Sequence, residues 1–498
     1  MLEYIIEQTI SFLAAMPKKE RKKIGQFFTS KETAVFMASL FDFSSIDDSI
    51  TVLDPGSGTG ILSAAFLERA ETVSGLKKIH ITCYETDSVV LPVLYNNLQY
   101  MKEHSVLEVE YNVIEKDYIL SQSSDFTHDL LESQNPVKYD YIIGNPPYLR
   151  ILRDHPAALA MPEVVYGAPN MYFLFAAMSL FNLKQDSEMV YIIPRSWTSG
   201  AYFKAFRTYL LKNGKIERVH LFVSRDKVFN QEQVLQETII IVIKKTTIQP
   251  DTVCLSSCQT SNDFSTTESV MLPYESVVVG DDLYVFLPTS EEEIDTIKRI
   301  NRYTTTMPDI GFRMKTGIIV DFRQWDELRS EVGEHIIPLF YAQHIKNGRV
   351  NHDPSGRDFD WVIDTKPGLI QRNKNYVFCK RFTAKEEYRR LQCGIYLSAD
   401  FPDYHNIGTQ NKINFVERVN GNDMSLEETY GIYALLNSTL FDSYYRILNG
   451  STQVNSTEVN SIPVPSLKEI AEIGKKLLQI GSLTTETCDT ILDEVAYG

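Results

Sequence analysis

A long alternation of strand-like and helix-like segments between residues 50 and 245 is the feature that most constrains how this 498-residue chain folds. Such alternation is typical of a mostly parallel sheet with helices on both faces, because each parallel strand needs a crossover back to the same edge. The chain is therefore predicted to contain an α/β domain. Strands are expected at residues 50–53, 79–84, 111–115, 139–143, 189–193, 216–223 and 237–243, and helices at residues 61–70, 91–101 and 201–211.

The last two of these strands are separated only by a loop, so we expect them to pair as an antiparallel edge of the sheet. After Lys245 the rhythm is lost, and residues 246–267 are rich in Thr, Ser, Gln and Asp, which indicates a linker or boundary. Two domains are predicted: residues 1–245, with a helix over residues 1–16, and residues 246–498. The second is expected to mix helices and strands and to end in helices at residues 430–448 and 466–478.

The composition, 43% apolar and 23% charged, describes a soluble globular protein. No stretch approaches the roughly 18 uninterrupted apolar residues of a membrane span. The N-terminal segment carries Glu3 and Glu7 where a signal peptide would carry basic residues. A cytoplasmic location without membrane contact is therefore expected. The six cysteines lack zinc-like spacing, so we expect them to be reduced and structural, with no metal site.

The tetrapeptide Asn145-Pro146-Pro147-Tyr148 follows the strand predicted at residues 139–143. An Asn side-chain oxygen and a backbone carbonyl can both accept hydrogen bonds from a planar NH2 group, and the fixed φ of the prolines keeps the turn rigid. These bonds draw the nitrogen toward sp3 geometry and make it nucleophilic, while the Tyr ring can stack on a base. The tetrapeptide is also compatible with an ordinary chain-reversing turn.

A glycine-rich loop, Asp54-Pro55-Gly56-Ser57-Gly58-Thr59-Gly60, separates the first predicted strand from the first predicted helix. Gly56, Gly58 and Gly60 let the backbone pass close to a ligand beside a helix N-terminus. The spacing is Gly-x-Gly-x-Gly, where a dinucleotide fingerprint has Gly-x-Gly-x-x-Gly, and Asp54 would repel a pyrophosphate. Both points favour, over a dinucleotide, a ligand that carries an ammonium group and no phosphates. S-adenosylmethionine is such a ligand.

Carboxylates follow the next two predicted strands. Glu85 ends the strand at residues 79–84, where its carboxylate can accept hydrogen bonds from both ribose hydroxyls, and Asp87 is the alternative. Asp117 follows the strand at residues 111–115 and could accept from the adenine amine of the cofactor. A lone Asp in such a loop is also typical of a cap or a solvated turn, so both interpretations of Asp117 stay open.

The net charge of −16 opposes a nucleic-acid ligand at first sight, because a phosphate backbone attracts Lys and Arg. The distribution of charge is more informative than its sum. Basic residues cluster at residues 18–23 and again at residues 372–390. Each cluster is compatible with a phosphate-binding surface and equally with a solvated face.

Together these motifs resemble those of the N6-adenine DNA methyltransferases of type II restriction-modification systems, with the gamma-type motif order and an Asn-Pro-Pro-Tyr catalytic motif. Residues 433–441, 449–455 and 462–465 are similar to the recognition domain of modification methylases of the PstI and BsuBI kind. The resemblance covers most of the chain. It implies a Rossmann-like, mostly parallel sheet of seven strands with helices on both faces in residues 1–245, and a C-terminal mixed α+β target-recognition domain.

The resemblance also implies a set of site residues. Residues 25–29 resemble the motif that closes over the methionine part of the cofactor, and Phe229 lies in a segment similar to one that contacts the target adenine, although it also suits a core position. The implied S-adenosylmethionine ligands are Gln26, Phe28, Thr29, Asp54, Gly56, Gly58, Gly60, Glu85, Asp117 and Asn145. The implied catalytic residues are Asn145, Pro146, Pro147, Tyr148 and Phe229.

On this resemblance the enzyme binds double-stranded DNA, turns one adenine out of the stack and methylates N6 by in-line displacement. Asn145 and the Pro146 carbonyl would accept hydrogen bonds from N6, and Tyr148 would stack on the base. No dedicated base or metal is required, because the proton becomes acidic only as the new C–N bond forms. A monomer is expected, and the sequence leaves open whether a separately encoded cognate restriction endonuclease exists.

Sequence reading would fall to the C-terminal domain, where Arg, Lys, Asn and Gln side chains can address base edges in the major groove. A palindromic hexamer such as CTGCAG is the first recognition sequence that the resemblance suggests. Each candidate residue is also compatible with a solvated loop. The candidates are His344, Lys346, Arg349, Gln371, Arg372, Asn373, Lys374, Lys380 and Arg381.

Two alternatives to a DNA methyltransferase remain open from the sequence. The acidic net charge favours a methyltransferase that acts on RNA or on protein glutamine, since short Asn-Pro-Pro-Tyr motifs occur in those enzymes as well. The other alternative is a non-catalytic DNA-specificity subunit that retains the fold. The intact glycine loop and the intact residues 145–148 argue against the second alternative.

Overall fold

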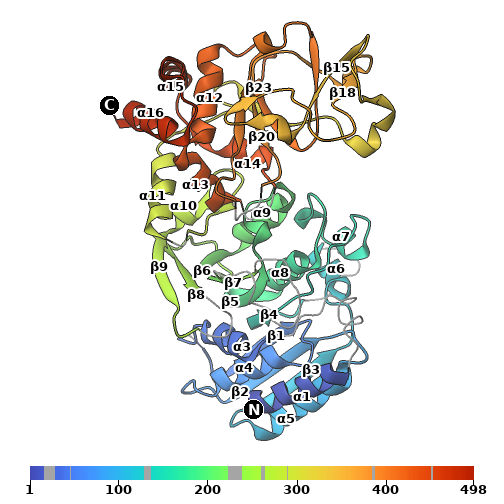
Figure 1. Cartoon of the computed structure of the whole chain (residues 1–498). Helices are drawn as coiled ribbons and strands as arrows, with labels where there is room; N and C mark the ends of the chain where they lie inside the picture. Colours follow the sequence, from blue (N-terminus) through green and yellow to red (C-terminus); the bar gives the residue numbers. More distant parts are fainter. Residues whose placement is uncertain are drawn as a thin grey trace. The chain divides into compact units, whose positions relative to one another are not determined.

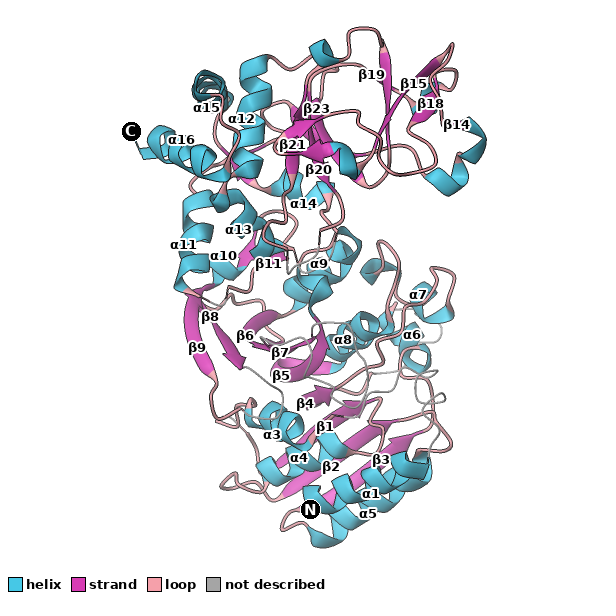
Figure 2. Cartoon of the chain, in the orientation of Figure 1, coloured by secondary structure: helices cyan, strands magenta, loops and turns pink. Residues whose placement is uncertain are grey.

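A computed structural model describes residues 1–15, 29–44, 46–127, 136–222, 238–258, 264–288, 290–383, 387–449 and 453–497. The chain forms two units, Met1–Thr289 and Ser290–Gly498. Figure 1 follows the chain through both units, and Figure 2 shows their helices and strands. Across the described ranges, no helix combines the length and the apolar character that a membrane crossing requires.

The first unit is built on a nine-stranded sheet with the order β3-β2-β1-β4-β5-β7-β6-β8-β9. Its strands are β1 (Ser49–Pro55), β2 (Lys78–Tyr84), β3 (Glu108–Ile114), β4 (Tyr139–Gly144), β5 (Leu183–Pro194), β6 (Lys215–Phe222), β7 (Thr238–Lys244), β8 (Thr252–Cys258) and β9 (Glu268–Pro273). From β3 to β5 all neighbours pair in parallel, and β7 runs antiparallel between β5 and β6. The predicted α/β class with a mostly parallel sheet is therefore confirmed, but the sheet has nine strands where seven were predicted.

The two strands expected at the edge of the sheet lie inside it. β6 pairs antiparallel with β7 and parallel with β8, where Arg218 lies opposite Cys254, and β9 is the outer strand. The predicted edge was wrong, and the boundary expected after residue 245 falls within the first unit. The polar composition after Lys245 concealed β8, although its central residues are buried. A two-stranded sheet of β10 (Val278–Val279) and β11 (Tyr284–Val285) follows.

Helices cover both faces of the nine-stranded sheet. The described helices of this unit are α1 (Leu2–Ala15), α3 (Lys31–Ser39), α4 (Ile61–Ala70), α5 (Leu91–His104), α6 (Ser123–Phe126), α7 (Pro156–Leu159), α8 (Met171–Asn182), α9 (Lys204–Asn213) and α10 (Tyr274–Val277). Val190 and Ile192 of β5 face a core shared with α1, α3, α4 and α5. The intervening Tyr191 points to the other face, where its hydroxyl lies 2.5 Å from Ser179 Oγ of α8.

Local signals account for the ends of several of these helices. The Ser30 hydroxyl caps α3 by accepting a hydrogen bond from the Thr33 amide, and α4 starts at the residue after the glycine loop. α9 ends at Gly214, as predicted, but it starts only at Lys204, because residues 201–203 form a 3-10 turn. The predicted helix starts at residues 61 and 91 are confirmed.

The second unit contains two larger sheets and a set of helices. Phe340, Phe378 and Tyr396 are fully buried in a core to which both sheets contribute, and the Phe378 and Tyr396 rings stack there with centroids 5.2 Å apart. The six-stranded sheet has the order β13-β23-β20-β21-β17-β16, and the five-stranded sheet has the order β14-β18-β15-β22-β19. The strands are β12 (Thr305–Thr306), β13 (Phe312–Thr316), β14 (Leu328–Arg329), β15 (Ile336–Phe340), β16 (Ile345–Lys346), β17 (Arg349–Val350), β18 (Trp361–Ile363), β19 (Gln371–Arg372), β20 (Tyr376–Lys380), β21 (Cys393–Tyr396), β22 (Asn406–Thr409), β23 (Ile413–Arg418) and β24 (Pro463–Val464).

One predicted helix of the second unit is in fact two helices. The described helices are α11 (Glu291–Ile300), α12 (Leu426–Asn437), α13 (Thr439–Leu448), α14 (Ser456–Ser461), α15 (Leu467–Ile480) and α16 (Thr485–Tyr497). The single helix expected at residues 430–448 was wrong, because the chain is extended at Ser438, whose hydroxyl accepts from the Phe441 amide and caps α13. The helix expected at residues 466–478 is confirmed as α15.

Candidate active site

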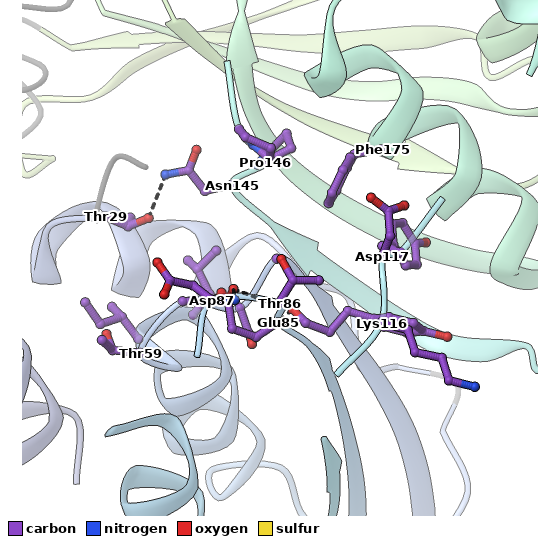
Figure 3. Close-up of a pocket in the computed structure, with 18 residues that line it drawn as sticks. Thr29, Thr59, Glu85, Thr86, Asp87, Lys116, Asp117, Asn145, Pro146 and Phe175 are labelled. Atoms are coloured by element: carbon purple, nitrogen blue, oxygen red, sulfur yellow. Dashed lines mark hydrogen bonds between the residues drawn. The ribbon is translucent and has the colours of Figure 1, made fainter. Parts of the chain in front are cut away.

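A pocket of about 450 Å³ lies at the carboxyl ends of β1 to β4, where the loops after four neighbouring parallel strands converge. Figure 3 shows the residues around it, with Thr29 and Asn145 on one side and Lys116 and Asp117 on another. This edge is where an open parallel sheet commonly binds its ligand. The lining residues are Thr29, Gly56, Ser57, Gly58, Thr59, Ile61, Leu62, Tyr84, Glu85, Thr86, Asp87, Lys116, Asp117, Tyr118, Asn145, Pro146, Pro147 and Phe175.

The glycine loop after β1 forms one wall of the pocket. Gly56, Gly58 and Gly60 have φ values of +68°, +54° and +86°, in the left-handed region that favours glycine. The loop is tied to the end of β2, because the Ser57 amide donates to the Tyr84 carbonyl at 3.0 Å. Gly56 and Gly58 line the pocket, whereas Gly60 lies behind it, where a Cβ would come within 3.2 Å of Leu94 Cδ1.

Asp54, a predicted cofactor ligand, lies beneath this loop and does not line the pocket. Its side chain is 1% exposed, and Oδ2 accepts a hydrogen bond from Ser63 Oγ at 2.7 Å. Among the described residues, Oδ1 has no hydrogen-bond partner. Burial raises the pKa of Asp54 to about 7, because a carboxylate is poorly solvated there. Asp54 therefore supports the loop from below.

Glu85, the predicted ribose ligand, lines the pocket at the end of β2. Its Oε1 accepts from the amides of Thr86 and Asp87 at 2.7 and 2.8 Å, and its Oε2 accepts from the Gly58 amide at 3.0 Å. Burial raises the pKa of Glu85, and these three amide bonds oppose that shift. A carboxylate offers about four acceptor sites, so Oε2 retains capacity for a ligand hydroxyl.

Asp117 lines the pocket and also acts as a local cap. Its Oδ1 accepts from the amides of Ile119 and Leu120 at 2.9 and 2.8 Å, which fixes the turn after β3. The two interpretations left open by the sequence are thus compatible, because the same carboxylate stabilises a turn and faces the pocket. Asp87, the alternative to Glu85, lines the pocket as well and accepts from the Val89 amide at 2.9 Å.

The residues after β4 bring the first three residues of the Asn-Pro-Pro-Tyr motif to the same pocket, and Tyr148 is not among its described lining residues. Asn145, Pro146 and Pro147 line it, and Asn145 Nδ2 donates to Thr29 Oγ1 at 3.1 Å. This bond sets which end of the amide faces Thr29. Gly144 precedes the motif because a Cβ there would lie 2.8 Å from the Tyr191 ring.

The Tyr148 ring is held at both its hydroxyl end and its edge. The hydroxyl donates to the Ile192 carbonyl of β5 at 3.0 Å, and the ring meets Tyr172 edge to face with centroids 6.3 Å apart. Burial of the hydroxyl raises the pKa of Tyr148, so the phenol stays protonated. Tyr172 is anchored in turn, because its hydroxyl lies 3.2 Å from Ser196 Oγ. Tyr148 is therefore a half-buried ring in a fixed orientation.

The pocket also contains residues that the sequence analysis did not identify. Phe175 of α8 is 7% exposed, and its Cε1 would lie 3.4 Å from a Cβ placed on Gly56. Its ring forms part of the pocket wall close to Asp117. α8 is apolar over nearly its whole length, so no sequence signal separates Phe175 from the core residues around it. Gln26, Phe28 and Phe229, three predicted site residues, lie outside the described residues.

The structure separates the predicted DNA-reading residues of the second unit. His344 is 1% exposed, its Nδ1 accepts from the Tyr341 amide, and burial lowers its pKa to about 4, so it cannot reach a base edge. This burial corrects the prediction for His344. Other candidates bind within the unit: Arg349 contacts the Tyr430 hydroxyl at 2.6 Å, Lys380 the Gln392 side chain at 2.9 Å, and Arg381 the Asn411 carbonyl at 3.0 Å.

The remaining candidates and the basic cluster at residues 372–390 also divide by environment. Lys346 is exposed, 3.5 Å from Asp353, and Arg372 is exposed, whereas Lys374 is half-buried and donates to the Gly421 carbonyl. Asn373 Nδ2 donates to the Phe401 and Tyr404 carbonyls, and Gln371 Oε1 accepts from Thr409 Oγ1 at 2.8 Å. Arg390 is fully buried. The cluster is therefore not one continuous basic surface.

Comparison with protein families identifies a match over residues 62–229 with the Eco57I restriction-modification methylase family. The chain is 32% identical to the type II methyltransferase M.BsuBI of Bacillus subtilis, over 96% of this chain and 95% of that protein. It is also 32% identical to the type II methyltransferase M.PstI of Providencia stuartii, over 95% of this chain and 93% of that protein.

Solved structures give weaker similarities. The type IIL restriction-modification enzyme MmeI, determined in complex with DNA, matches with a TM-score of 0.49 and 12% identity over 99% of this chain and 74% of that chain. A Listeria monocytogenes protein described as a class I S-adenosylmethionine-dependent methyltransferase matches with a TM-score of 0.41 and 15% identity over 53% of this chain and 75% of that chain.

The two methyltransferase relatives match this chain along nearly its whole length, so the similarity includes both units. Membership of this methyltransferase family confirms the prediction that S-adenosylmethionine is the cofactor. The residues of the pocket suit that group, since acidic, aromatic and glycine positions converge on one cavity in which Lys116 is the one basic residue among the described lining residues. The chain belongs to the family of type II restriction-modification methyltransferases that includes M.BsuBI and M.PstI.

Proposed function

We propose that the protein is a site-specific DNA methyltransferase that transfers a methyl group from S-adenosylmethionine to N6 of adenine, as the modification enzyme of a restriction-modification system. Membership of the type II methyltransferase family supports DNA methylation. The choice of adenine N6 rests on the residues after β4. Asn145 and the two prolines supply oxygen acceptors and no backbone donor beyond Asn145, which suits an exocyclic NH2 group.

The observation that carries the proposal is the meeting of Asn145 with the glycine loop and Glu85 in one pocket. When bound, S-adenosylmethionine supplies an electrophilic methyl group on a sulfonium. Glu85 Oε2 would accept from a ribose hydroxyl, and Asp117 and Phe175 would hold the cofactor's adenine ring. Thr29 would hold the Asn145 amide in the orientation in which Oδ1 accepts from the target amine.

The target base would reach this site only after leaving the duplex, because N6 inside a base pair is already hydrogen-bonded and cannot align with the methyl group. Tyr148 would then stack on the extruded base, which its anchored ring is oriented to do. Proximity and alignment would supply much of the rate. N6 would form its bond to the methyl carbon as the bond from that carbon to sulfur breaks, and the N6 proton would leave to solvent.

We further propose that the C-terminal part of the chain reads the DNA sequence. This part was predicted as residues 246–498, and the second unit, Ser290–Gly498, lies within it. Lys346 and Arg372, whose side chains are exposed, are the candidates that we propose for contact with DNA. A monomer would act on duplex DNA, and the matching restriction endonuclease would be a separate chain. CTGCAG is the first sequence to test.

The test is to express the protein in a host that lacks adenine methylation and to sequence the host DNA for modified bases. We expect N6-methyladenine at one short recurring sequence, and none in a matched host that expresses the Asn145→Ala variant. N4-methylcytosine at the recurring sequence would overturn the choice of base. Unmodified DNA together with methylated RNA or protein would overturn DNA as the substrate, and failure to bind the cofactor would favour a non-catalytic specificity subunit.

A further inference from the structure

Large apolar side chains are exposed directly after the catalytic motif, in a segment that we call the post-catalytic loop (residues 149–159). Leu152 is 75% exposed and Leu159 is 64% exposed, and Leu149 is 44% exposed. Exposing one leucine is ordinary, but three within eleven residues that begin next to Tyr148 form a local apolar surface. The methyl-transfer chemistry proposed above does not use these side chains.

The base of the post-catalytic loop is held in place. The Met171 amide donates to the Leu149 carbonyl at 2.9 Å, and the Ile151 amide donates to the Pro169 carbonyl at 3.0 Å, so the loop pairs with the residues that lead into α8. Ile151 is buried, which pins this pairing to the protein. The segment that carries Leu152 therefore projects from a fixed platform.

The tip of the loop is equally ordered. The His155 amide donates to the Leu152 carbonyl at 3.2 Å, and His155 Nδ1 accepts from the Ala157 amide at 3.2 Å and caps α7. Ala157 and Ala158 are buried, so α7 is packed on the body of the unit. Leu152 thus occupies a turn between a paired arm and a packed helix, and its exposure is a property of an ordered site.

The distance from the active site follows from chain geometry. Leu152 is four residues beyond Tyr148, and four residues span at most about 14 Å. Tyr148 itself is anchored to β5. Any duplex whose target base stacks on Tyr148 must therefore bring its neighbouring bases close to the post-catalytic loop.

The charge around the loop suits DNA better than it suits most other partners of this acidic protein. Arg150 and Arg153 are exposed, as is the neighbouring acidic Asp154, and among the described residues neither guanidinium forms an ion pair. Arg153 instead donates to the backbone carbonyls of Gly167, at 2.9 Å, and Tyr166. Two positive charges that flank an apolar tip match a phosphate backbone on either side of a base stack.

We propose that Leu152 enters the base stack of the duplex and fills the space that the extruded target base leaves. Proteins that unstack DNA commonly insert Leu, Phe, Ile or Met between bases, and the contact offsets part of the cost of unstacking. This inference rests on the proposed function, because it requires that a base be extruded from duplex DNA. Leu152 touches neither cofactor nor reacting atoms, so it is a positioning residue.

The test compares Leu152→Ala with the unmodified protein on two duplexes that carry the sequence identified by DNA sequencing. In one the target adenine is paired with thymine, and in the other it faces an abasic position, where extrusion costs less. We expect Leu152→Ala to lower kcat/KM on the paired duplex about tenfold and on the abasic duplex less than about twofold. The fluorescence of 2-aminopurine at the target position should fall in parallel on the paired duplex.

The matched control is Val106→Ala, which truncates an 82% exposed apolar side chain. Val106 lies just before the amino end of β3, whereas the post-catalytic loop follows the carboxyl end of β4. This variant should leave both duplexes unaffected. Because Leu152 is exposed, its truncation should not alter the melting temperature, which is measured alongside. Equal losses on both duplexes, or no loss on either, would overturn the role of Leu152. Absence of methylation by the unmodified protein would instead overturn the proposed function, and the inference would fall with it.

Discussion

At the scale of single residues, Asn145 and Tyr148 contribute differently to the site. The Asn145 amide faces the pocket beside Thr29, whereas the Tyr148 ring is a surface fixed by the Ile192 carbonyl and by Tyr172. The proposed chemistry needs the first as a hydrogen-bond acceptor in the transition state and the second as a stacking platform. Loss of either side chain should therefore have a different kinetic signature.

We expect Asn145→Ala to lower the rate of methyl transfer by a factor on the order of 1000, because it removes a preorganised polar group at the reacting nitrogen. Cofactor affinity, measured by calorimetry, should change little. Tyr148→Ala should be milder, on the order of 10- to 100-fold, which is the range for loss of one stacked base. Parallel loss of cofactor affinity and of methyl transfer in Asn145→Ala would show that the motif is structural.

A pH prediction concerns Asp54. Burial raises its pKa from 3.8 to about 7 in the folded protein, so folding is accompanied by proton uptake between these values. The stabilisation from the protonated carboxyl is fully present below about pH 4 and is lost as the pH rises through 7. Asp54→Asn should flatten this part of the pH dependence of the unfolding free energy, as measured by urea denaturation without cofactor. The same pH dependence in Asp54→Asn and in the unmodified protein would contradict the raised pKa of Asp54.

At the scale of elements, the glycine loop connects the cofactor site to the packing of α5. Gly60 has a φ of +86°, and a Cβ there would lie 3.2 Å from Leu94 Cδ1 of α5. Gly75 has a similar φ of +91°, but a Cβ there would meet no atom within 4 Å. Substitution of either glycine should therefore cause backbone strain, but only substitution of Gly60 should also cause a steric contact.

We expect both Gly60→Ala and Gly75→Ala to lower the unfolding free energy by about 1–2 kcal/mol through left-handed strain. Gly60→Ala should lose more, since Leu94 must move, and it alone should weaken cofactor binding. Thermal denaturation and calorimetry with S-adenosylmethionine measure the two effects. Equal behaviour of the two variants would mean that the contact with Leu94 does not matter.

Much of the fold and site was predictable at this scale, and the exceptions have physical causes. β1, β2 and β4 are short apolar runs bounded by glycine, proline or acidic turns, so their carboxyl ends and the loops after them could be placed. The role of Phe175 could not be predicted, because the sequence of an almost wholly apolar helix does not show which of its sides faces a pocket. The burial of His344 could not be predicted either, because a histidine in a polar stretch gives no sign of it. The break at Ser438 was missed because a capping serine within a helical pattern of apolar residues cannot be told from a residue in the middle of a helix.

At the scale of the whole molecule, the division after Thr289 changes what the catalytic unit contains. β8 and β9 extend the sheet beyond β6, and Val253 and Leu255 of β8 are buried. The expected boundary after residue 245 would leave β6 as an open edge with apolar surface exposed.

A chain truncated after residue 289 should therefore fold and bind S-adenosylmethionine, whereas a chain truncated after residue 245 should aggregate. Neither should methylate a specific DNA sequence, because both lack the second unit. Circular dichroism, gel filtration and cofactor calorimetry report the outcomes. A monomeric, cofactor-binding chain of residues 1–245 would show that β8 and β9 are dispensable.

The central claim is that Asn145 and the cofactor pocket act together on the N6 amine of adenine. The most direct measurement is mass spectrometry of nucleosides from duplex DNA after reaction with the purified protein and S-adenosylmethionine. We predict N6-methyldeoxyadenosine in the reaction with the unmodified protein and, at equal cofactor occupancy, an initial rate of its formation lower by a factor on the order of 1000 with Asn145→Ala. A different methylated nucleoside, or the same yield from both proteins, would contradict the claim.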